Sequence, residues 1–416
     1  MSDDTKTPYH DEEKFPGALA NHPLGGKHQE NGTAVLVADD GVNRERGIIG
    51  TMWKVVTWLD SFGVEVRGIE RVPPDARHHT SIADAMWLWM SANFTISTFS
   101  LGSLGPVRKL SLIGPYCLLK VIFIIMLGEG AQYMTSAPLQ SGPVEAANVL
   151  SFGAAIAGFA LGWTSLAADY TVNFPVEASS TSVFIYTYIG LNIPLIFVEI
   201  LGAAMMTTFG AKPSWGALYD ENGLGGLLFA PLSPMEGFGR FLLVILALSI
   251  VANNIPNMYS FALTFQAFGK LAQQIPRIFL VCFGTVIYII LAIVGADHFE
   301  SWLDTLLVIL SYWLAIYTVI LCWEHFYFRR GKWSNYNLDA YNTPSLLPVG
   351  YAAAGACAFG IMGAVLGMAQ TWYVGVIGKK IGLPEYGGDI GFELSGSFSF
   401  ITYPIFRTLE RRYTGR

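Results

Sequence analysis

Long apolar stretches, separated by short polar ones, occupy most of the chain after residue 80. Each is long enough, at about 1.5 Å per residue, for a helix to cross a hydrocarbon core of about 30 Å. The pattern therefore predicts an all-α integral membrane protein with about nine transmembrane helices within residues 81–409. The nine predicted spans are Ile82–Leu104, Leu110–Tyr133, Ala146–Tyr170, Ser182–Phe209, Phe241–Phe268, Arg277–Gly295, Trp302–Phe328, Leu347–Trp372 and Ile390–Leu409.

The first 80 residues contain no such stretch and are predicted to form a cytosolic tail, as are residues 410–416. Up to about residue 42 they are rich in Asp, Glu, Gly, Pro and His, which predicts disorder. A short amphipathic helix is predicted over Ile48–Val66, where Ile49, Trp53, Val56 and Trp58 occur among polar residues. This helix either lies at the membrane surface or packs on the protein's own cytosolic face. No charged start is followed by an apolar region, so we expect no cleavable signal peptide.

Composition narrows the possible functions. The chain of 416 residues is 52% hydrophobic and 13% charged, and its mean hydropathy of +0.44 is too high for a soluble domain of this size. The net charge of -6 arises mostly in the first 80 residues, so the sequence indicates no basic surface for nucleic acid. Motifs for zinc, serine-nucleophile, phosphate-loop and dinucleotide chemistry are missing, and the four cysteines have no metal-binding or disulfide spacing. We therefore expect no enzyme activity, cofactor or metal.

Loop charges orient the predicted spans. Basic residues follow the fifth, seventh and ninth spans, which places those ends in the cytosol because cytosolic loops carry an excess of Lys and Arg. These residues are Lys270 and Arg277, then Arg329, Arg330 and Lys332, and finally Arg407, Arg411, Arg412 and Arg416, with Lys379 and Lys380 as the exception. Alternating the sides of the membrane backwards from the ninth span places Arg108 and Lys109 in the cytosol, on the same side as the N-terminal tail. The first span would then begin and end on one side, so either an odd number of crossings is missing or this stretch does not span.

Three asparagines and a proline interrupt the apolar fifth span at Val251–Ser260. Asn253 and Asn257 are four residues apart and share one face of a helix, while Pro256 removes a backbone donor and predicts a kink. An amide offers one acceptor and two donors, which suits a planar, neutral, hydrogen-bonding solute. The alternative is that these amides only join neighbouring helices.

Trp163 in the third span is a second candidate. Gly162 weakens the helix just before it, so the span can unwind there and expose backbone groups to a solute. An indole face is a natural stacking partner for a planar heterocycle, although a packed core tryptophan with a satisfied N–H would have the same sequence. Asp169, near the cytosolic end of the span, is a candidate for a cap, a gate or proton coupling.

Further polar residues lie deep in other predicted spans. Asn93 and Ser97 are near the middle of the first, where small polar residues often only help helices to pack. Glu199, in the fourth, is the most costly residue to bury, and intramembrane acids usually face a cavity or a partner. It is a candidate proton carrier, the alternative being a hydrogen bond to a neighbouring helix.

Five longer motifs occur along the chain. They are RGIERVPP at 67–74, SAN at 91–93, GWTSLAADYTV at 162–172, VANNIPNMYS at 251–260 and GGDIGFEL at 387–394. In these motifs and their order, the chain resembles the fungal purine-cytosine permeases of nucleobase-cation symporter family 1 over nearly everything after residue 60. The resemblance implies a twelve-helix transporter with two inverted five-helix repeats, which imports neutral nucleobases (cytosine, adenine, guanine and hypoxanthine) with a proton across the plasma membrane. It leaves open whether the protein is a homo-oligomer.

The resemblance also implies roles for individual residues. Trp163 matches the tryptophan that stacks on the base, and Asn253, Pro256 and Asn257 match the recognition and kink positions of the family's eighth helix. The residues that fall in the family's first helix, where the site is also lined, are Asn93 and Ser97.

One departure from the family is large. The family has three further helices, its second to fourth, where this chain has only Pro106 to Arg108, and these helices include a Trp-x-x-x-Asn element that forms the other wall of the base site. The stretch Leu110–Tyr133 resembles the fifth helix directly. The loss of three helices removes an odd number of membrane crossings, which agrees with the orientation predicted from the loop charges. We therefore expect a truncated form of the five-plus-five fold that transports poorly or not at all. The alternatives are a transporter of a vitamin such as a B6 form, and a non-transporting membrane protein that associates with an intact permease.

Overall fold

The structure is a computed structural model that describes the chain in ranges separated by gaps. The described residues are 47–62, 68, 69, 72, 77, 81–103, 116–136, 142–295, 299–337, 340, 343–382 and 387–416. The chain divides into two compact units, one formed by Met1–Glu70 with Gln266–Arg277 and the other by Arg71–Phe265 with Ile278–Arg416. The junction between Pro106 and Arg108, where the family has three further helices, lies outside the described residues.

The smaller unit combines one helix from the N-terminal region with the segment that connects α9 (Glu236–Ala267) to α11 (Arg277–Gly295). Helix α1 (Gly47–Asp60) overlaps the predicted amphipathic stretch. The connecting segment contains the short helix α10 (Lys270–Gln273). The Trp53 indole N–H donates to the Gln274 carbonyl oxygen at 2.9 Å, which joins α1 to this segment.

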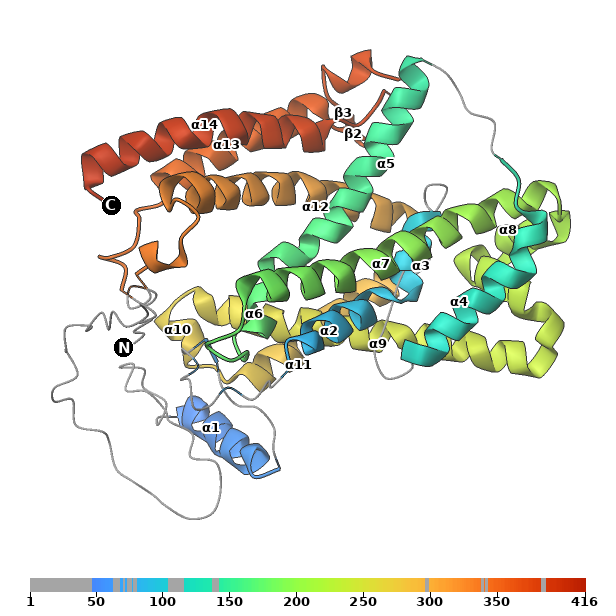
Figure 1. Cartoon of the computed structure of the whole chain (residues 1–416), viewed down its shortest axis with the longest axis horizontal. Coiled ribbons are helices and arrows are strands. Elements are labelled where there is room, and N and C mark those ends of the chain that lie inside the picture. Colours follow the sequence, from blue (N-terminus) through green and yellow to red (C-terminus); the bar gives the residue numbers. More distant parts are fainter. Residues whose placement is uncertain are drawn as a thin grey trace, which may run out of the picture. The chain divides into compact units, whose positions relative to one another are not determined.

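The larger unit is built of helices with one small pair of strands (Figure 1). Besides α9 and α11, its helices are α2 (Ala83–Asn93), α3 (Ile96–Ser103), α4 (Tyr116–Gly130), α5 (Pro143–Gly162), α6 (Ala167–Thr171), α7 (Ser180–Met206), α8 (Pro213–Phe229), α12 (Phe299–Cys322), α13 (Tyr351–Gly367) and α14 (Gly391–Thr414). Strands β2 (Ala369–Gln370) and β3 (Tyr373–Val374) pair in antiparallel fashion between α13 and α14. Short 3₁₀ turns cover Ala131–Tyr133, Trp163–Ser165, Thr207–Gly210, Ala230–Met235, Trp333–Asn335 and Gly378–Lys380, and a π-helical turn covers Trp323–Phe328.

Five helical runs among the described residues are long and apolar enough to cross a membrane. They are Pro143–Ser165, Ser180–Gly210, Pro213–Ala267, Arg277–Gly295 and Thr305–Phe328. This confirms an all-helical membrane protein with several apolar spans. The first predicted span is divided near Phe94 into α2 and α3, and α4 and α13 have only 15 and 17 residues. The count of nine spans therefore remains a prediction.

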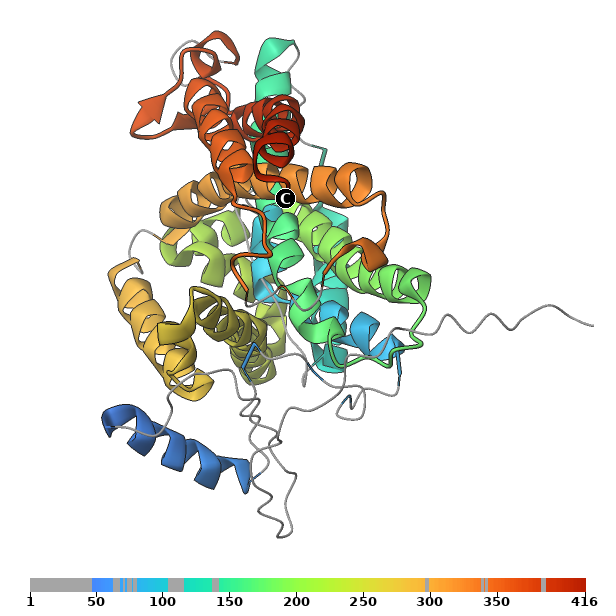
Figure 2. The same ribbon diagram turned by 90° about the vertical axis from the view of Figure 1, so that its left-hand side faces the viewer.

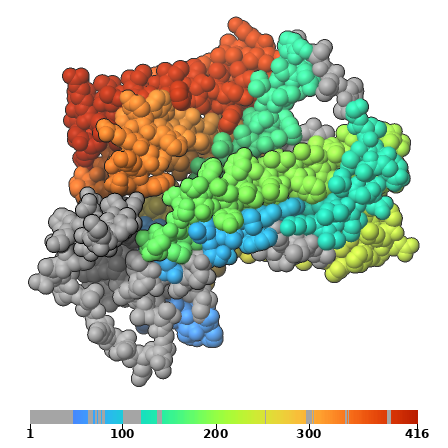
Figure 3. All heavy atoms as spheres, viewed as in Figure 1, coloured from blue at the N-terminus to red at the C-terminus, as the bar shows by residue number. Residues whose placement is uncertain are grey.

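Glycines allow the helices of the larger unit to approach one another closely. A Cβ atom at Gly158 of α5 would lie 2.5 Å from the carbonyl oxygen of Leu307 in α12, and one at Gly190 of α7 would lie 2.6 Å from that of Met86 in α2. Small residues permit such close packing in membranes. Helices α2 and α3 accordingly lie along α7 (Figure 3), and α13 and α14 lie side by side in both ribbon views, with the strands at one end (Figure 2).

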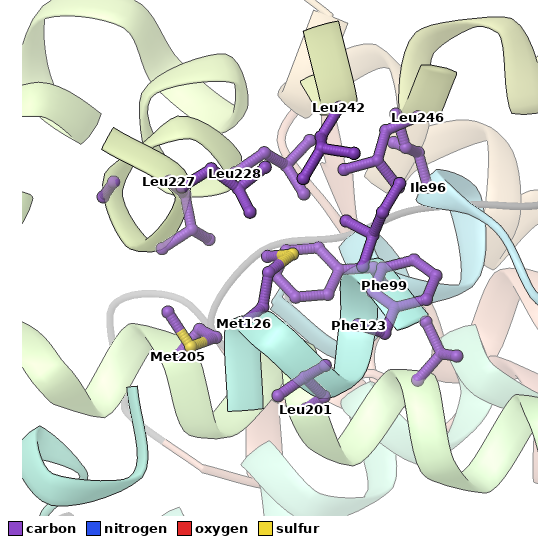
Figure 4. Close-up of a cluster of buried hydrophobic side chains, with 14 of the residues drawn as sticks. Ile96, Phe99, Phe123, Met126, Leu201, Met205, Leu227, Leu228, Leu242 and Leu246 are labelled. Atoms are coloured by element: carbon purple, nitrogen blue, oxygen red, sulfur yellow. The ribbon is translucent and has the colours of Figure 1, made fainter. Parts of the chain in front are cut away.

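A large apolar core joins α3, α4, α7, α8 and α9 (Figure 4). Phe99 of α3 stacks on Phe123 of α4 with ring centroids 5.9 Å apart, and Leu227 of α8 is fully buried in the same cluster. Helix α8 occupies a stretch that the apolar pattern left between two spans. Its sequence combines Asp220 and Glu221 with several glycines, so its apolar residues do not recur with the period of a helix. At Gly223 the backbone leaves the helical conformation (φ 55°).

Candidate functional site

The break between α2 and α3 positions the first group of predicted site residues. Asn93 is the last residue of α2, and Phe94 then leaves the helical conformation with φ -81° and ψ 78°. Every side chain from Ser91 to Phe99 is buried. A helix break deep in a membrane protein is tolerated where the freed backbone groups find partners, and here the Ile96 N–H meets the Ser249 hydroxyl of α9 at 3.5 Å.

A second break lies at Trp163. Helix α5 ends at Gly162 and the chain tightens into a 3₁₀ turn over Trp163–Ser165 before α6 begins. The backbone thus changes its helical type beside the predicted weak point, but it remains hydrogen-bonded. The Trp163 indole N–H donates to Asn93 Oδ1 at 3.2 Å, and the Asn93 amide donates to the Trp89 carbonyl oxygen at 2.9 Å.

Helix α9 supplies the third element of the site. Asn253 donates through its side-chain amide to the carbonyl oxygen of Ala92 at 3.0 Å. Asn257 donates to both the carbonyl oxygen and Oδ1 of Asn253, each at 3.2 Å. The helix continues through Pro256 to Ala267, and the Pro256 carbonyl oxygen accepts a hydrogen bond from Tyr170 at 2.9 Å.

Asn93 and Trp163 form one hydrogen-bonded pair, and Asn253 and Asn257 form another. The Asn253 bond to the carbonyl oxygen of Ala92, the neighbour of Asn93, brings the two pairs together. We call the four residues the asparagine cluster; they come from three segments that are far apart in the sequence, namely α2, the end of α5 and α9. The hydrogen bonds include features of both predicted roles, the joining of neighbouring helices and the binding of a solute. The amides of Asn93 and Asn253 do join helices. The amide of Asn257 instead bonds, within the described part of the chain, to a neighbour on its own helix, which leaves its oxygen available to a solute.

Three buried hydroxyl groups adjoin these helices without a hydrogen-bond partner within the described chain. They belong to Thr95, Ser97 and Thr98. A buried polar group without a partner costs about 1–3 kcal/mol, so native proteins satisfy such groups with water or ligand. The predicted site residue Ser97 is one of the three, and all of them lie on the few residues that follow the break after Asn93.

The two acidic candidates lie on different elements. Asp169 of α6 is half-buried and lies near the Ser260 hydroxyl and Tyr317. Glu199 is buried in the middle of α7, the helix that packs along α2 and α3. Neither carboxylate belongs to the asparagine cluster itself.

Sequence reasoning missed two aromatic residues of this region. Trp89 packs edge-on against Trp163 and Tyr170, with ring centroids 5.2 and 5.6 Å apart, and Tyr170 also contacts Tyr259 at 5.5 Å. Trp89 lies four residues before Asn93 and so shares its face of α2, a spacing that could have indicated it. Tyr170 follows Asp169 directly in the GWTSLAADYTV motif.

Two cavities of about 480 and 490 Å³ lie elsewhere, on α12 and its neighbours. Both are lined mainly by apolar side chains, such as Phe326 and Phe400 in one and Trp313 and Ile320 in the other. Neither includes a predicted site residue. Within the described residues, no group of His, Cys, Asp and Glu has the arrangement of a metal site.

Comparison with known proteins agrees with this assembly of motifs. Residues 112–375, more than half of the chain, match the family model described as permease for cytosine/purines, uracil, thiamine, allantoin. The chain belongs to this permease family. Members of a permease family are transporters and not enzymes.

Several curated permeases are similar to the chain. Purine-cytosine permease fcyB of Emericella nidulans is 46% identical over 299 residues, which cover 71% of this chain and 58% of that protein. Purine-cytosine permease FCY21 of Saccharomyces cerevisiae is 40% identical over 329 residues (79% and 61%). Vitamin B6 transporter TPN1 of Saccharomyces cerevisiae is 32% identical over 314 residues (65% and 54%). The chain thus spans between half and two thirds of the length of these relatives, and no solved structure matches it.

Proposed function

We propose that the chain derives from a proton-coupled importer of neutral nucleobases, namely cytosine, adenine, guanine and hypoxanthine, and that the asparagine cluster with Ser97 forms one wall of the base site. The observation that carries the proposal is the meeting of one indole and three amides at two helix breaks. Relatives with 40–46% identity that are named purine-cytosine permeases support the substrate class.

The chemistry of the cluster suits a base. The faces of an indole ring can stack on a planar heterocycle. Asn93 Oδ1 accepts the hydrogen bond of the Trp163 indole N–H and so fixes the orientation of the ring. The amides of Asn253 and Asn257 can each donate to and accept from the edge of a base. A base that replaces the Asn257-to-Asn253 hydrogen bonds loses little, because those bonds connect neighbours on one helix turn.

Proton coupling is assigned to Glu199 or Asp169. Asp169 lies beside the hydroxyl of Ser260, on the turn of α9 after Asn257. Glu199 is the more deeply buried of the two, and a buried carboxylate that takes up a proton avoids the cost of burying a charge in the membrane. The proposed location is the plasma membrane, with both tails in the cytosol.

We further propose that this form of the protein transports poorly, because the wall that faces Trp163 and Asn257 is missing. The unpartnered hydroxyls of Thr95, Ser97 and Thr98 in the described chain support this interpretation. So does the family match, which begins at residue 112, directly after the junction at which three helices are expected. Alternating access requires both repeats to move around a shared site, and a repeat without most of its scaffold cannot supply this motion.

Uptake of radiolabelled cytosine and adenine in a host without nucleobase transporters tests both parts. We expect little uptake by this chain and saturable uptake by a version in which the family's second to fourth helices are restored between Pro106 and Arg108. Robust saturable uptake by this chain would overturn the proposed impairment. No uptake by the restored version, at equal surface expression, would overturn the nucleobase function.

A vitamin is the second candidate substrate, because one relative with 32% identity is named a vitamin B6 transporter. Competition in the restored version distinguishes the two. Cytosine, adenine and hypoxanthine should compete with the labelled base, and pyridoxine should not; the reverse order would favour the vitamin. Co-purification of this chain with an intact permease, in the absence of any substrate-induced thermal shift, would instead favour the non-transporting role.

A further inference from the structure

Helix α1 has two apolar faces, and the described residues cover only one of them. Val56 is buried and Ile49, Met52, Trp53 and Leu59 are partly buried. These residues recur at spacings of three and four and so form one face of the helix. Trp53 fixes this face on the connecting segment Gln266–Arg277 through its hydrogen bond to Gln274.

The second apolar face is exposed in the described structure. Ile48, Val55 and Phe62 follow one another at seven-residue intervals, and Trp58 lies between them on the same side. Their exposed fractions are 78%, 42%, 69% and 61% in the order Ile48, Val55, Phe62 and Trp58. Trp58 and Phe62 also contact each other edge-on, with ring centroids 4.9 Å apart. The remaining face carries the exposed polar residues Lys54, Thr57 and Ser61.

The connecting segment has exposed apolar side chains of its own. Phe268 is 83% exposed and Leu271 is 79% exposed, with the exposed Lys270 between them. Because this segment joins the two apolar helical runs Pro213–Ala267 and Arg277–Gly295, the chain itself holds it at the surface of the membrane. Whatever packs on it is held there as well.

We propose that α1 is an interfacial anchor that docks on the connecting segment through Trp53 and inserts its second apolar face, Ile48–Val55–Trp58–Phe62, among lipid headgroups. Tryptophan is typical of the membrane–water interface, where an apolar ring with a polar N–H finds both environments. The two apolar faces of α1 adjoin each other and leave only a narrow polar face. A helix of this kind, held at the membrane surface, lies in the plane of the membrane–water interface. Phe268 and Leu271 extend the same contact from the connecting segment.

The charges favour ordinary neutral lipid over a specific acidic lipid. Lys54 and Asp60 are the charged residues of α1 and cancel, whereas recognition of acidic headgroups requires a cluster of several basic residues. We therefore expect insertion to be driven by buried apolar area and to be nearly independent of salt.

Site-directed fluorescence on the full chain tests the anchor. The cysteines Cys117, Cys282, Cys322 and Cys357 are first replaced by serine, and single cysteines are introduced as Val55→Cys or Trp58→Cys on the open apolar face and as Lys54→Cys or Thr57→Cys on the polar face. Each is labelled with an environment-sensitive dye and reconstituted in phosphatidylcholine vesicles, with or without lipids brominated near the headgroup end of their acyl chains. All four positions are exposed, so the matched variants should fold equally well.

We expect the brominated lipid to quench the dye at Val55→Cys and Trp58→Cys about threefold more than at Lys54→Cys and Thr57→Cys. Equal quenching on both faces would overturn the proposal. So would a dye that is shielded at Val55→Cys and Trp58→Cys but is not quenched by the brominated lipid, because protein rather than lipid would then cover the face. A parallel comparison of Leu271→Cys with Lys270→Cys tests the extension of the contact to the connecting segment. The proposal does not depend on transport, so its outcome is separate from that of the uptake experiments.

Discussion

Two buried polar clusters contact α5, one near its middle and one just after its C-terminal end, and they differ in how their hydrogen bonds are completed. In the first, Asp389 accepts hydrogen bonds from Tyr312, from Gln370 and from the backbone N–H groups of Ala369 and Gly391. Its own N–H donates to Ser151 of α5 at 2.9 Å. In the second, the asparagine cluster holds Trp163, but hydroxyl groups on the residues after Asn93 have no partner in the described chain.

The difference separates a scaffold from a site. A buried polar network in which every member is satisfied rigidifies its surroundings, while a partly satisfied one depends on groups that arrive from elsewhere. Helix α5 is therefore fixed at Ser151 to α12 and the start of α14, and at Trp163 it ends in a region where some buried hydroxyl groups have no partner in the described chain. This arrangement supports the proposal that a solute binds at the Trp163 end. It also predicts that substitutions in the Asp389 cluster will cost more stability than those near Trp163, some of which should instead weaken binding.

The largest loss of stability is expected for Asp389→Ala. The substitution removes one acceptor that four donors share in a buried region, at an expected cost on the order of 3 kcal/mol or more. Thermal unfolding of the detergent-solubilised protein should show a clear fall in Tm, or the variant should fail to accumulate. The exposed acid Asp220 provides the control, because Asp220→Ala removes a carboxylate from α8 that is open to solvent. Equal Tm values for the two variants would remove the distinction between scaffold and site.

A smaller loss is expected for Asn93→Ala, which removes the acceptor of the Trp163 N–H and the donor to the Trp89 carbonyl oxygen. We expect a destabilisation of about 1–3 kcal/mol, the cost of one unsatisfied buried group. The double variant Asn93→Ala with Trp163→Phe should lose less than the two single variants added together, because the phenyl ring needs no acceptor. Strict additivity, measured by denaturant unfolding, would show that the bond contributes nothing.

Nucleobase binding should weaken about tenfold in Asn257→Ala, which corresponds to the loss of about one hydrogen bond to the base. Stability should change little, since the amide of Asn257 bonds to Asn253 of its own helix and to no other helix within the described residues. Equilibrium binding of labelled adenine to the purified chain and to its restored version provides the measurement. Asn254→Ala is the matched control, because Asn254 points about 100° away on the same turn. A larger effect of Asn254→Ala would move the site to another face of α9.

The sequence predicted the fold class because apolar length is a local property that a helix in lipid must have. It did not predict α8, whose glycines and acids hide any helical period, or the division of the first span at Phe94, since neither Phe94 nor Thr95 is a helix-breaking residue. Asn93, Trp163, Asn253 and Asn257 were each identified as candidates from residue type and resemblance. That Asn93 would bond to Trp163, and Asn253 to the backbone beside Asn93, depends on how three helices pack, which no single stretch specifies.

The smallest effect on stability is expected for Thr98→Val. This substitution should be neutral or stabilising, whereas most substitutions destabilise. Valine has nearly the shape of threonine, and the Thr98 hydroxyl is fully buried without a partner in the described chain. Its removal should leave stability unchanged or raise it by up to about 1 kcal/mol, because an unsatisfied group is deleted without opening a cavity. Thr208→Val is the control, since the Thr208 hydroxyl is equally buried but donates to the Met205 carbonyl oxygen at 2.7 Å. A destabilisation by Thr98→Val that equals or exceeds that by Thr208→Val would mean that the hydroxyl has a partner, such as a bound water. The region after the break would then be as complete as the Asp389 cluster, and the argument that it awaits a base or a facing helix would fail.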